Sequence, residues 1–235
     1  WWNREVMRGV IAPRRALRGR PVVDTDYLVN TVYVDLVPMD FAAILGNSIT
    51  FHPIATDAES GLAVDLAPLI HDESTLRLAL RSSTGIPLLA GPPVHLAGRR
   101  FMDGGLAEMV PVRTALAQGA THAVVLRTRR PGEDLRPPGN MQFHIIRRYL
   151  KRHAPGAIPA WRNRYAVAQD EEKLLATHPR VRQIRPPSHG PTVPGTSRGA
   201  RRLKATVDLG RATARSTLTR WLANSDPVGS THSRG

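Results

Sequence analysis

The stretch Arg100-Phe-Met-Asp-Gly-Gly-Leu-Ala-Glu-Met-Val-Pro-Val112 decides the fold of this chain. At its centre, Asp103 is followed by Gly104 and Gly105, two residues without side chains. A Pro-rich segment precedes the stretch, and a helical pattern and then a short apolar run follow it. This order predicts an aspartate that serves as the base of a serine hydrolase. The alternative is a plain hairpin turn, because Asp-Gly is a strong hairpin signal.

The segments around Asp103 alternate between strand and helix patterns. Runs rich in apolar and β-branched side chains predict strands, and the last of them suits a strand buried on both faces, as in a parallel sheet. Acidic residues in a first turn, Pro near a first turn and Gly119 after a last turn set the helix limits. This alternation predicts an α/β fold in layers. The predicted strands cover 48–56, 62–66 and 121–127, and the predicted helices cover 72–81 and 110–118.

The remaining segments predict a largely helical second half. Residues 22–40 are extended and then helical, with Asp24 or Asp26 as the helix cap. Residues 129–140 have the composition of a linker, and residues 186–199 that of a Pro/Gly/Ser-rich loop. Further helices are predicted at 141–152, 160–176 and 201–222, a strand at 181–185 and a disordered tail at 224–235.

The net charge of +14 is concentrated in the second half of the chain. Residues 1–126 hold 11 Lys and Arg against 12 Asp and Glu, whereas residues 127–235 hold 22 against 7. The second half therefore predicts a surface that meets anions, such as lipid headgroups, nucleic acid or an acidic partner. The alternative is a solvated, Arg-rich tail.

The composition limits the class of protein. The 235 residues, 41% of them hydrophobic, suffice for one sizeable core with an appended subdomain. Without Cys there is no disulfide, Cys-ligated metal or thiol nucleophile, and a reducing cytoplasm is permitted. No apolar run approaches the ~20 residues that span a bilayer, and no secretory leader is visible. The chain begins with Trp1 rather than Met, so we expect a piece of a longer reading frame.

Five short stretches together resemble the patatin-like phospholipase family, through their order and spacing. Residues 140–185 also resemble, more loosely, a helical extension that follows the core in some bacterial members. The five stretches are Ala55-Thr-Asp-Ala-Glu-Ser-Gly61, Leu78-Ala-Leu-Arg-Ser-Ser-Thr-Gly-Ile-Pro87, Pro92-Pro-Val94, Asp103-Gly-Gly-Leu-Ala-Glu-Met-Val-Pro-Val112 and Gly119-Ala-Thr-His-Ala-Val-Val-Leu126.

The resemblance implies a three-layer sheet with flanking helices, N-terminally truncated and followed by a mostly helical basic extension. It also implies acyl-ester hydrolysis by a Ser–Asp dyad without His, in which Asp103 is the aspartate and Gly104 and Gly105 support it. The family's Gly-rich oxyanion loop and Gly-x-Ser-x-Gly nucleophile turn are not found before Asp103. We therefore expect the chain alone to be inactive. The implied divisions are 1–128 for the later portion of the hydrolase domain, 129–140 for a linker, 141–223 for the basic helical extension and 224–235 for a tail.

The proposed role of Asp103 has a chemical basis. A serine hydroxyl is a weak nucleophile until a base takes its proton, so the base must be ionised, partly desolvated and held still. The glycines let the backbone pass close to the nucleophile turn and offer N–H groups that orient the carboxylate. The motif Gly195-Thr-Ser-Arg-Gly199 matches Gly-x-Ser-x-Gly, but the Pro-rich residues before it cannot form the strand that a nucleophile turn needs. We therefore do not expect Ser197 to be the nucleophile.

The sequence predicts no cofactor and no metal, because it lacks a His-x-x-x-His pair and a tight Asp/His cluster. Asp57 and Glu59 lie in a predicted turn, where they are interpreted as turn residues, with cation binding as the alternative. We assign no catalytic role to Arg99 or Arg100.

The predicted helix at 201–222 carries an apolar stripe flanked by basic residues, a pattern that suits an anionic membrane surface. The interpretation we favour is a stripe that packs on the domain. Nucleic acid is disfavoured as a partner because few aromatic residues interleave the basic ones. The expected function is that of a lipid acyl hydrolase acting on a lipid or acyl ester, cytoplasmic and peripheral to a membrane. The alternative is a non-catalytic basic module that binds anionic membranes or nucleic acid. The stripe consists of Leu203, Val207, Ala214, Leu218 and Trp221.

Overall fold

The computed structural model describes residues 4–133, 137, 139–191, 193, 197 and 199–223. Its strands are β1 (Ile54–Asp57), β2 (Ala63–Asp65), β3 (Val94–Leu96), β4 (Arg99–Asp103), β5 (Ala123–Leu126) and β6 (Val181–Ile184). Its α-helices are α1 (Arg4–Val10), α2 (Thr25–Tyr27), α3 (Phe41–Leu45), α4 (Glu73–Ser83), α5 (Val112–Ala117), α6 (Asn140–His153), α7 (Ile158–Thr177) and α8 (Ala200–Ala223). Short 3₁₀ or π segments are η1 (Pro13–Arg18), η2 (Leu28–Leu36), η3 (Ala67–Leu69), η4 (Gly104–Leu106) and η5 (Pro155–Ala157).

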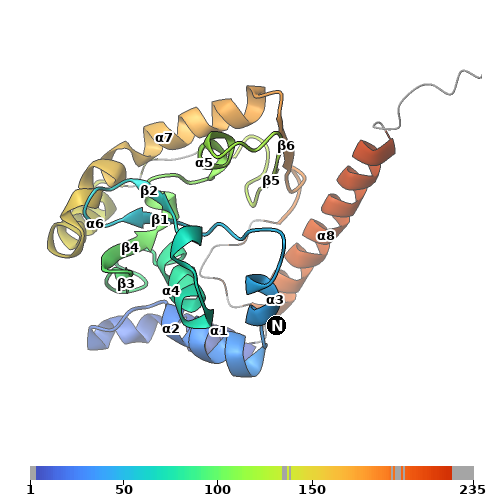
Figure 1. The fold of residues 1–235 in the computed structure, drawn as a ribbon. Coiled ribbons are helices and arrows are strands. Elements are labelled where there is room, and N and C mark those ends of the chain that lie inside the picture. The colour runs from blue at the N-terminus through green and yellow to red at the C-terminus, as the bar shows by residue number, and fades with distance from the viewer. Residues whose placement is uncertain are drawn as a thin grey trace, which may run out of the picture.

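The main sheet has four antiparallel strands in the order β2-β1-β4-β3, and β5 and β6 form a separate parallel pair (Figure 1). Within the main sheet, Ala55 of β1 pairs with Val64 of β2 on one side and with Asp103 of β4 on the other. Asp103 is therefore the last paired residue of β4, beside the central strand β1. The mixed α/β fold class predicted from the sequence is confirmed.

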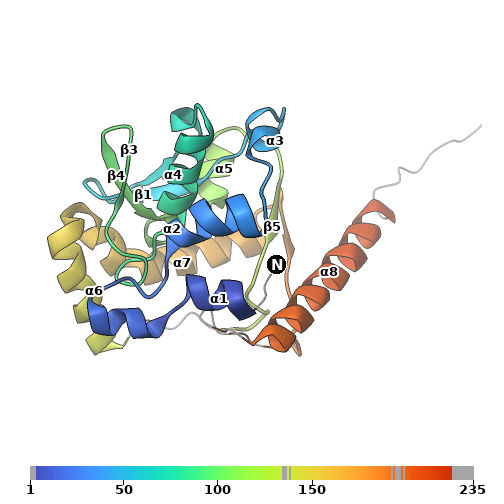
Figure 2. The same ribbon diagram turned by 90° about the horizontal axis from the view of Figure 1, so that it is seen from below.

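Helices cover both faces of the main sheet. On one face, Phe101 of β4 packs in a buried cluster with Ala79 of α4. On the other face, the neighbouring Met102 packs with Leu150 of α6 and Trp161 of α7. Successive residues of a strand point to opposite faces, so β4 joins both cores. Figures 1 and 2 show the resulting layers, with α7 on the far side of the sheet from α1 and α2.

The Asp103-Gly104 pair is not a hairpin turn, so this alternative is wrong. The hairpin lies just before it: β3 and β4 are joined through Ala97 and Gly98, whose φ angles are 48° and 73°. Positive φ at both central residues matches the twist of paired strands. After Asp103, the chain enters η4 and then α5. The strands β3 and β4 were not predicted from the sequence.

Two predicted strands differ from the structure. The strand predicted at 48–56 begins only at Ile54, because Pro53 has no N–H to donate and the Asn47 side chain instead accepts the N–H of Ile49 in a turn. The strand predicted at 121–127 is parallel to β6, as expected, but it is not buried on both faces. Val124 and Leu126 are 56% and 73% exposed.

Most predicted helices are confirmed with small shifts at their ends. Asp24 caps α2 by accepting the N–H of Tyr27 at 2.9 Å, so it is the cap in place of Asp26. Asp72 caps α4 in a capping box with Thr75. The second half contributes α6, α7, β6 and α8 where they were predicted. The predicted tail at 224–235 and part of the Gly195–Gly199 motif lie outside the described residues.

Candidate active site

Three hydrogen bonds fix Asp103 at the end of β4. Its main-chain N–H donates to the carbonyl oxygen of Gly85 at 3.1 Å. Its carbonyl oxygen accepts the hydroxyl of the buried Thr56 at 2.7 Å. Its carboxylate oxygen Oδ1 accepts the N–H of Gly105 at 2.7 Å. The carboxylate is therefore oriented by its own turn, as expected of the two glycines.

A close main-chain contact, rather than positive φ, requires a glycine at position 104, and Gly105 faces the end of the Asp103 side chain. A Cβ on Gly104 would lie 2.4 Å from the carbonyl oxygen of Ile54 in β1. A Cβ on Gly105 would lie 2.8 Å from Oδ1 of Asp103. The first contact lets β4 and η4 press against β1, and the second leaves room for the carboxylate. Each glycine therefore has its own structural reason.

Asp103 lines an apolar cavity of about 340 Å³, which we name the Asp103 cavity. Its walls come from the loop after α4, from η4, from α6 and from α7. Ile86, Leu88, Met141 and Ile145 lie on these walls and remain exposed. Exposed apolar side chains gathered around one cavity are typical of a site for an apolar ligand or partner.

The charge of Asp103 is balanced between burial and nearby positive groups. Burial raises the pKa of the Asp103 carboxyl above its ordinary value, while the N–H of Gly105 and the Arg164 guanidinium oppose that rise. Arg164 of α7 lies on the same cavity, and its Nε donates to the carbonyl oxygen of Gly105 at 2.8 Å. A raised pKa makes the carboxylate a stronger base than an exposed aspartate, provided that it is ionised.

Asp57, the last residue of β1, accepts hydrogen bonds in the turn that follows the strand. It accepts the N–H groups of Ser60 at 2.7 Å and Glu59 at 3.0 Å, and it pairs with Arg99 at 2.8 Å. Burial alone would raise its pKa, but these hydrogen bonds outweigh burial and lower the pKa below its ordinary value. The contacts support the interpretation of Asp57 as a turn residue. No cluster of three metal-ligating side chains occurs in the part of the chain that the structure describes.

No serine hydroxyl hydrogen-bonds to the Asp103 carboxylate among the described residues. The nearby Ser83 donates its hydroxyl to the carbonyl oxygen of Ile54 at 2.7 Å instead. Among the described residues, the Asp103 carboxylate therefore accepts the N–H of Gly105 and no serine hydroxyl.

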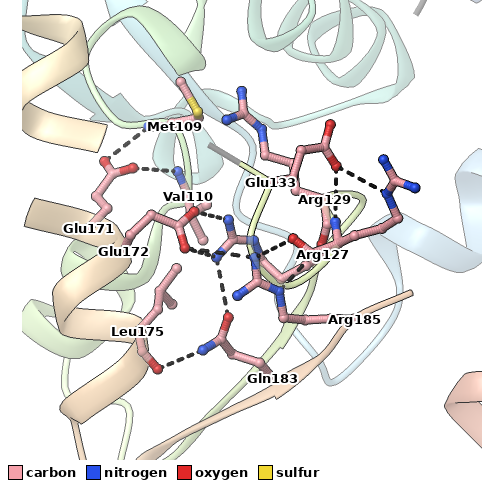
Figure 3. A network of polar contacts seen from close by, with 11 residues as sticks. Met109, Val110, Arg127, Arg129, Glu133, Glu171, Glu172, Leu175, Gln183 and Arg185 are labelled. Carbon is pink, nitrogen blue, oxygen red and sulfur yellow. Dashed lines mark hydrogen bonds and ion pairs between the residues drawn. The ribbon is translucent and has the colours of Figure 1, made fainter. Parts of the chain in front are cut away.

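The buried Glu171 of α7 supports the segment that follows the Asp103 motif, a contact that the sequence did not predict. Its two carboxylate oxygens accept the N–H groups of Met109 at 3.0 Å and Val110 at 3.2 Å, in the segment after η4 (Figure 3). Burial raises the pKa of Glu171, the two N–H groups oppose this, and the charge of Glu108 adds to it. Glu171 thus fastens the chain that follows the Asp103 motif to α7.

Replacing Glu171 with Ala is expected to destabilise the protein by about 2–5 kcal/mol, because two main-chain N–H groups lose their acceptor. Urea unfolding followed by circular dichroism measures the loss. Asp170→Ala is the matched control, since Asp170 is exposed and its ion pair within the described part of the chain is with Lys173 at 3.5 Å. Its effect should stay within about 0.5 kcal/mol. Equal stability of the two variants would contradict the role of Glu171.

Comparison with known proteins places a family similarity over the segment that carries Asp103. Residues 3–116 match the model of the patatin-like phospholipase family. Over 120 residues, the chain is 32% identical to the uncharacterized protein YjjU of Escherichia coli (strain K12), and the match covers 49% of this chain and 32% of that protein. Residues 3–116, just under half of the chain, therefore carry the similarity to the patatin-like phospholipase family. It spans about a third of the length of this curated relative.

Proposed function

We propose that this chain supplies the aspartate base and part of the acyl-binding surface of a lipid acyl hydrolase. The observation that carries the proposal is the position of Asp103: its carboxylate lines an apolar cavity, held by the N–H of Gly105. An ester with an apolar acyl chain fits such a cavity, and the carboxylate is available to accept a proton from a serine hydroxyl.

The serine of the proposed Ser–Asp dyad would come from sequence outside these 235 residues. None of the described serines contacts the Asp103 carboxylate, and the chain corresponds to 32% of its relative. The proposed step is proton transfer from the serine hydroxyl to Asp103 as the serine oxygen attacks the ester carbonyl. Asp103 then returns the proton to the leaving alkoxide as the ester C–O bond breaks, which leaves an acyl-serine. Water, which gives its proton to Asp103, then attacks the acyl-serine, and the proton returns to the serine oxygen as the acid is released.

The test is hydrolysis of p-nitrophenyl butyrate by the 235-residue chain and by the complete reading frame that contains it. We expect background rates for the former and Asp103-dependent turnover for the latter. Labelling of the complete protein by a fluorophosphonate at a serine outside these residues would support the proposal. A stop codon directly before the codon for Trp1, with no Gly-x-Ser-x-Gly sequence behind it, would contradict it, as would turnover abolished by Ser197→Ala.

A second candidate function is the docking of α8 on an anionic membrane, which would bring a hydrolase to its substrate. None of the described residues of α8 is buried, and Leu218 and Leu222 are 44% and 71% exposed. Arg211, Arg215 and Arg220 lie on the same helix, which lies at the edge of the molecule and contacts β6, where the Arg182 guanidinium lies 5.7 Å from the centre of the Trp221 ring (Figure 1). Exposed leucines beside arginines suit the boundary between acyl chains and anionic headgroups. No helix in the described residues is long and apolar enough to cross a bilayer.

The double variant Leu218→Ser/Leu222→Ser is expected to weaken binding to anionic vesicles by about tenfold or more, since each buried Leu contributes roughly 1.5–3 kcal/mol. Sedimentation with phosphatidylglycerol vesicles measures the binding, and phosphatidylcholine vesicles should bind weakly. Leu17→Ser is the control, because Leu17 is 88% exposed but lies on η1. An unchanged affinity in the double variant would overturn the membrane role of α8.

A further inference from the structure

A second cavity, of about 330 Å³, shares the side chains of Trp161 and Arg164 with the Asp103 cavity. We name it the basic cavity, because Arg129, Arg162 and Arg164 line it and no carboxylate occurs among its described lining residues. The same cavity includes Met109, Asn140, Phe143 and Tyr165. The wall between the two cavities therefore has an aspartate on one side and a group of arginines on the other.

Several donors on this wall have no acceptor in the described part of the chain. Trp161 is only 6% exposed, and its buried indole N–H has no hydrogen-bond partner among the described residues. Arg164 uses Nε to bond the carbonyl oxygen of Gly105, and no hydrogen bond involves its terminal nitrogens among the described residues. Arg129 and Arg162 likewise form no side-chain hydrogen bond or ion pair with described residues. The buried indole N–H without a partner at this cavity points to a ligand that supplies an acceptor, and the partly or fully exposed guanidinium groups can donate to the same ligand.

The backbone that carries Arg129 is held in place by a network from α7 and β6 (Figure 3). Arg185 donates to the carbonyl oxygens of Arg129 and Arg130, both at 3.3 Å. The nearby Arg127 is paired with Glu172, and its side chain is only 5% exposed. The Arg129 guanidinium is therefore presented from a fixed main chain, which lowers the entropy cost of binding a ligand.

The arginines also affect one another. Burial lowers the pKa of the Arg164 guanidinium, the Asp103 carboxylate opposes this, and the positive charge of Arg129 adds to the lowering. An arginine remains charged in a protein, so an anion bound between these groups would reduce the repulsion between them further. A planar guanidinium binds carboxylate or phosphate oxygens through paired N–H groups.

We propose that the basic cavity binds the oxyanion of an acyl compound, whose apolar chain lies along the wall of the Asp103 cavity. The oxyanion is either the carboxylate of a fatty acid or the phosphate of a phospholipid. The identity of the ligand as an acyl compound rests on the proposed function. The oxyanion site itself rests on the lining of the cavity.

The test is calorimetric titration of the 235-residue chain with octyl phosphate, octanoate and neutral octanol. Arg129→Gln and Arg162→Gln are each expected to weaken binding of the preferred anion about tenfold or more, since hydrogen bonds to charged groups contribute roughly 1.5–3 kcal/mol. Octanol should bind all variants alike. Arg180→Gln is the matched control, because Arg180 is exposed and lies outside both cavities. The tighter of the two anions identifies the source of the oxyanion.

Three results would overturn the site: no saturable binding of either anion, wild-type affinity in both cavity variants, or an equal loss in Arg180→Gln. The titration needs no turnover, so it is separate from the proposed hydrolysis. Asp103→Asn should retain or strengthen anion binding, because it removes a negative charge beside Arg164. Binding without hydrolysis by the complete protein would refute the proposed function alone, and hydrolysis without binding would refute the oxyanion site alone.

Discussion

Replacing Asp103 with Asn is expected to reduce ester hydrolysis by the complete protein about 10²–10⁴-fold, the usual contribution of a general base. Asn keeps the shape of the side chain and an oxygen that can accept the N–H of Gly105, so the turn should persist. It cannot accept the proton of a serine. The measurement is kcat/KM for a short-chain p-nitrophenyl ester. Asp57→Asn does not serve as a control, because it would break the ion pair of a buried carboxylate with Arg99 and disturb the fold.

The same variant should be more stable than the wild type at neutral pH. Burial raises the pKa of Asp103, so the folded protein holds the proton more tightly than the unfolded chain. The protonated Asp103 stabilises the folded state fully below the ordinary aspartate pKa of about 3.9. This stabilisation is lost as the pH rises through the raised pKa of Asp103 in the folded protein. Thermal melts should therefore show a higher Tm for Asp103→Asn at pH near 7, with the difference shrinking in acid. A lower Tm at neutral pH would contradict this account of the site.

Replacing Gly104 with Ala is expected to destabilise the protein by about 3 kcal/mol, at the upper end of overpacking effects. The new Cβ would lie 2.4 Å from the carbonyl oxygen and 3.0 Å from the carbonyl carbon of Ile54, both of them main-chain atoms. The main chains of β1 and β4 would have to separate, and β1 is central to the sheet. Chemical denaturation followed by circular dichroism measures the loss.

Gly139→Ala is the matched control for Gly104→Ala. Gly139 has φ −60°, and a Cβ there would meet nothing within 4 Å. Its effect should stay within about 0.5 kcal/mol. If Gly104→Ala is equally mild, the close approach of η4 to β1 is not what requires a glycine at that position.

The sequence was most informative where the reason for a residue is local. The Asp103-Gly104-Gly105 motif can be read directly, because the N–H of Gly105 reaches a carboxylate two residues away. The Asp72 cap at the start of α4 and Gly119 after α5, which has a φ of 94°, also follow from neighbouring residues and could be predicted. The strand β4 was missed because Arg99 and Arg100 give it no apolar alternation, although their neighbours Phe101 and Met102 are fully buried.

The rest of the site depends on contacts between segments far apart in the chain. Arg164 and Glu171 reach the segment after β4 from α7, about 60 residues away in sequence. Helical periodicity predicts α7 itself, but it does not say which surface the helix covers. Burial of a polar residue follows from such packing, so neither the acceptors of Glu171 nor the unpartnered indole of Trp161 could be predicted from the sequence.

The packing also changes how the second half of the chain is understood. Leu150, Ala157 and Trp161 share a buried cluster with Met102 and Leu106, so α6 and α7 complete the core around the Asp103 motif. At the corner between these helices, a Cβ on Gly156 would lie 1.7 Å from the carbonyl oxygen of Glu59. The proposed active site and the proposed oxyanion site both require this helical part, whereas α8 stands apart from them.

The central claim, that Asp103 is the base of a serine hydrolase, is tested most directly by the rate at which a fluorophosphonate labels the complete protein as a function of pH. The account predicts that the rate falls as the pH drops through the raised pKa of Asp103, and that Asp103→Asn labels slowly at every pH without this step. Identical pH profiles and rates for the two proteins would contradict the claim.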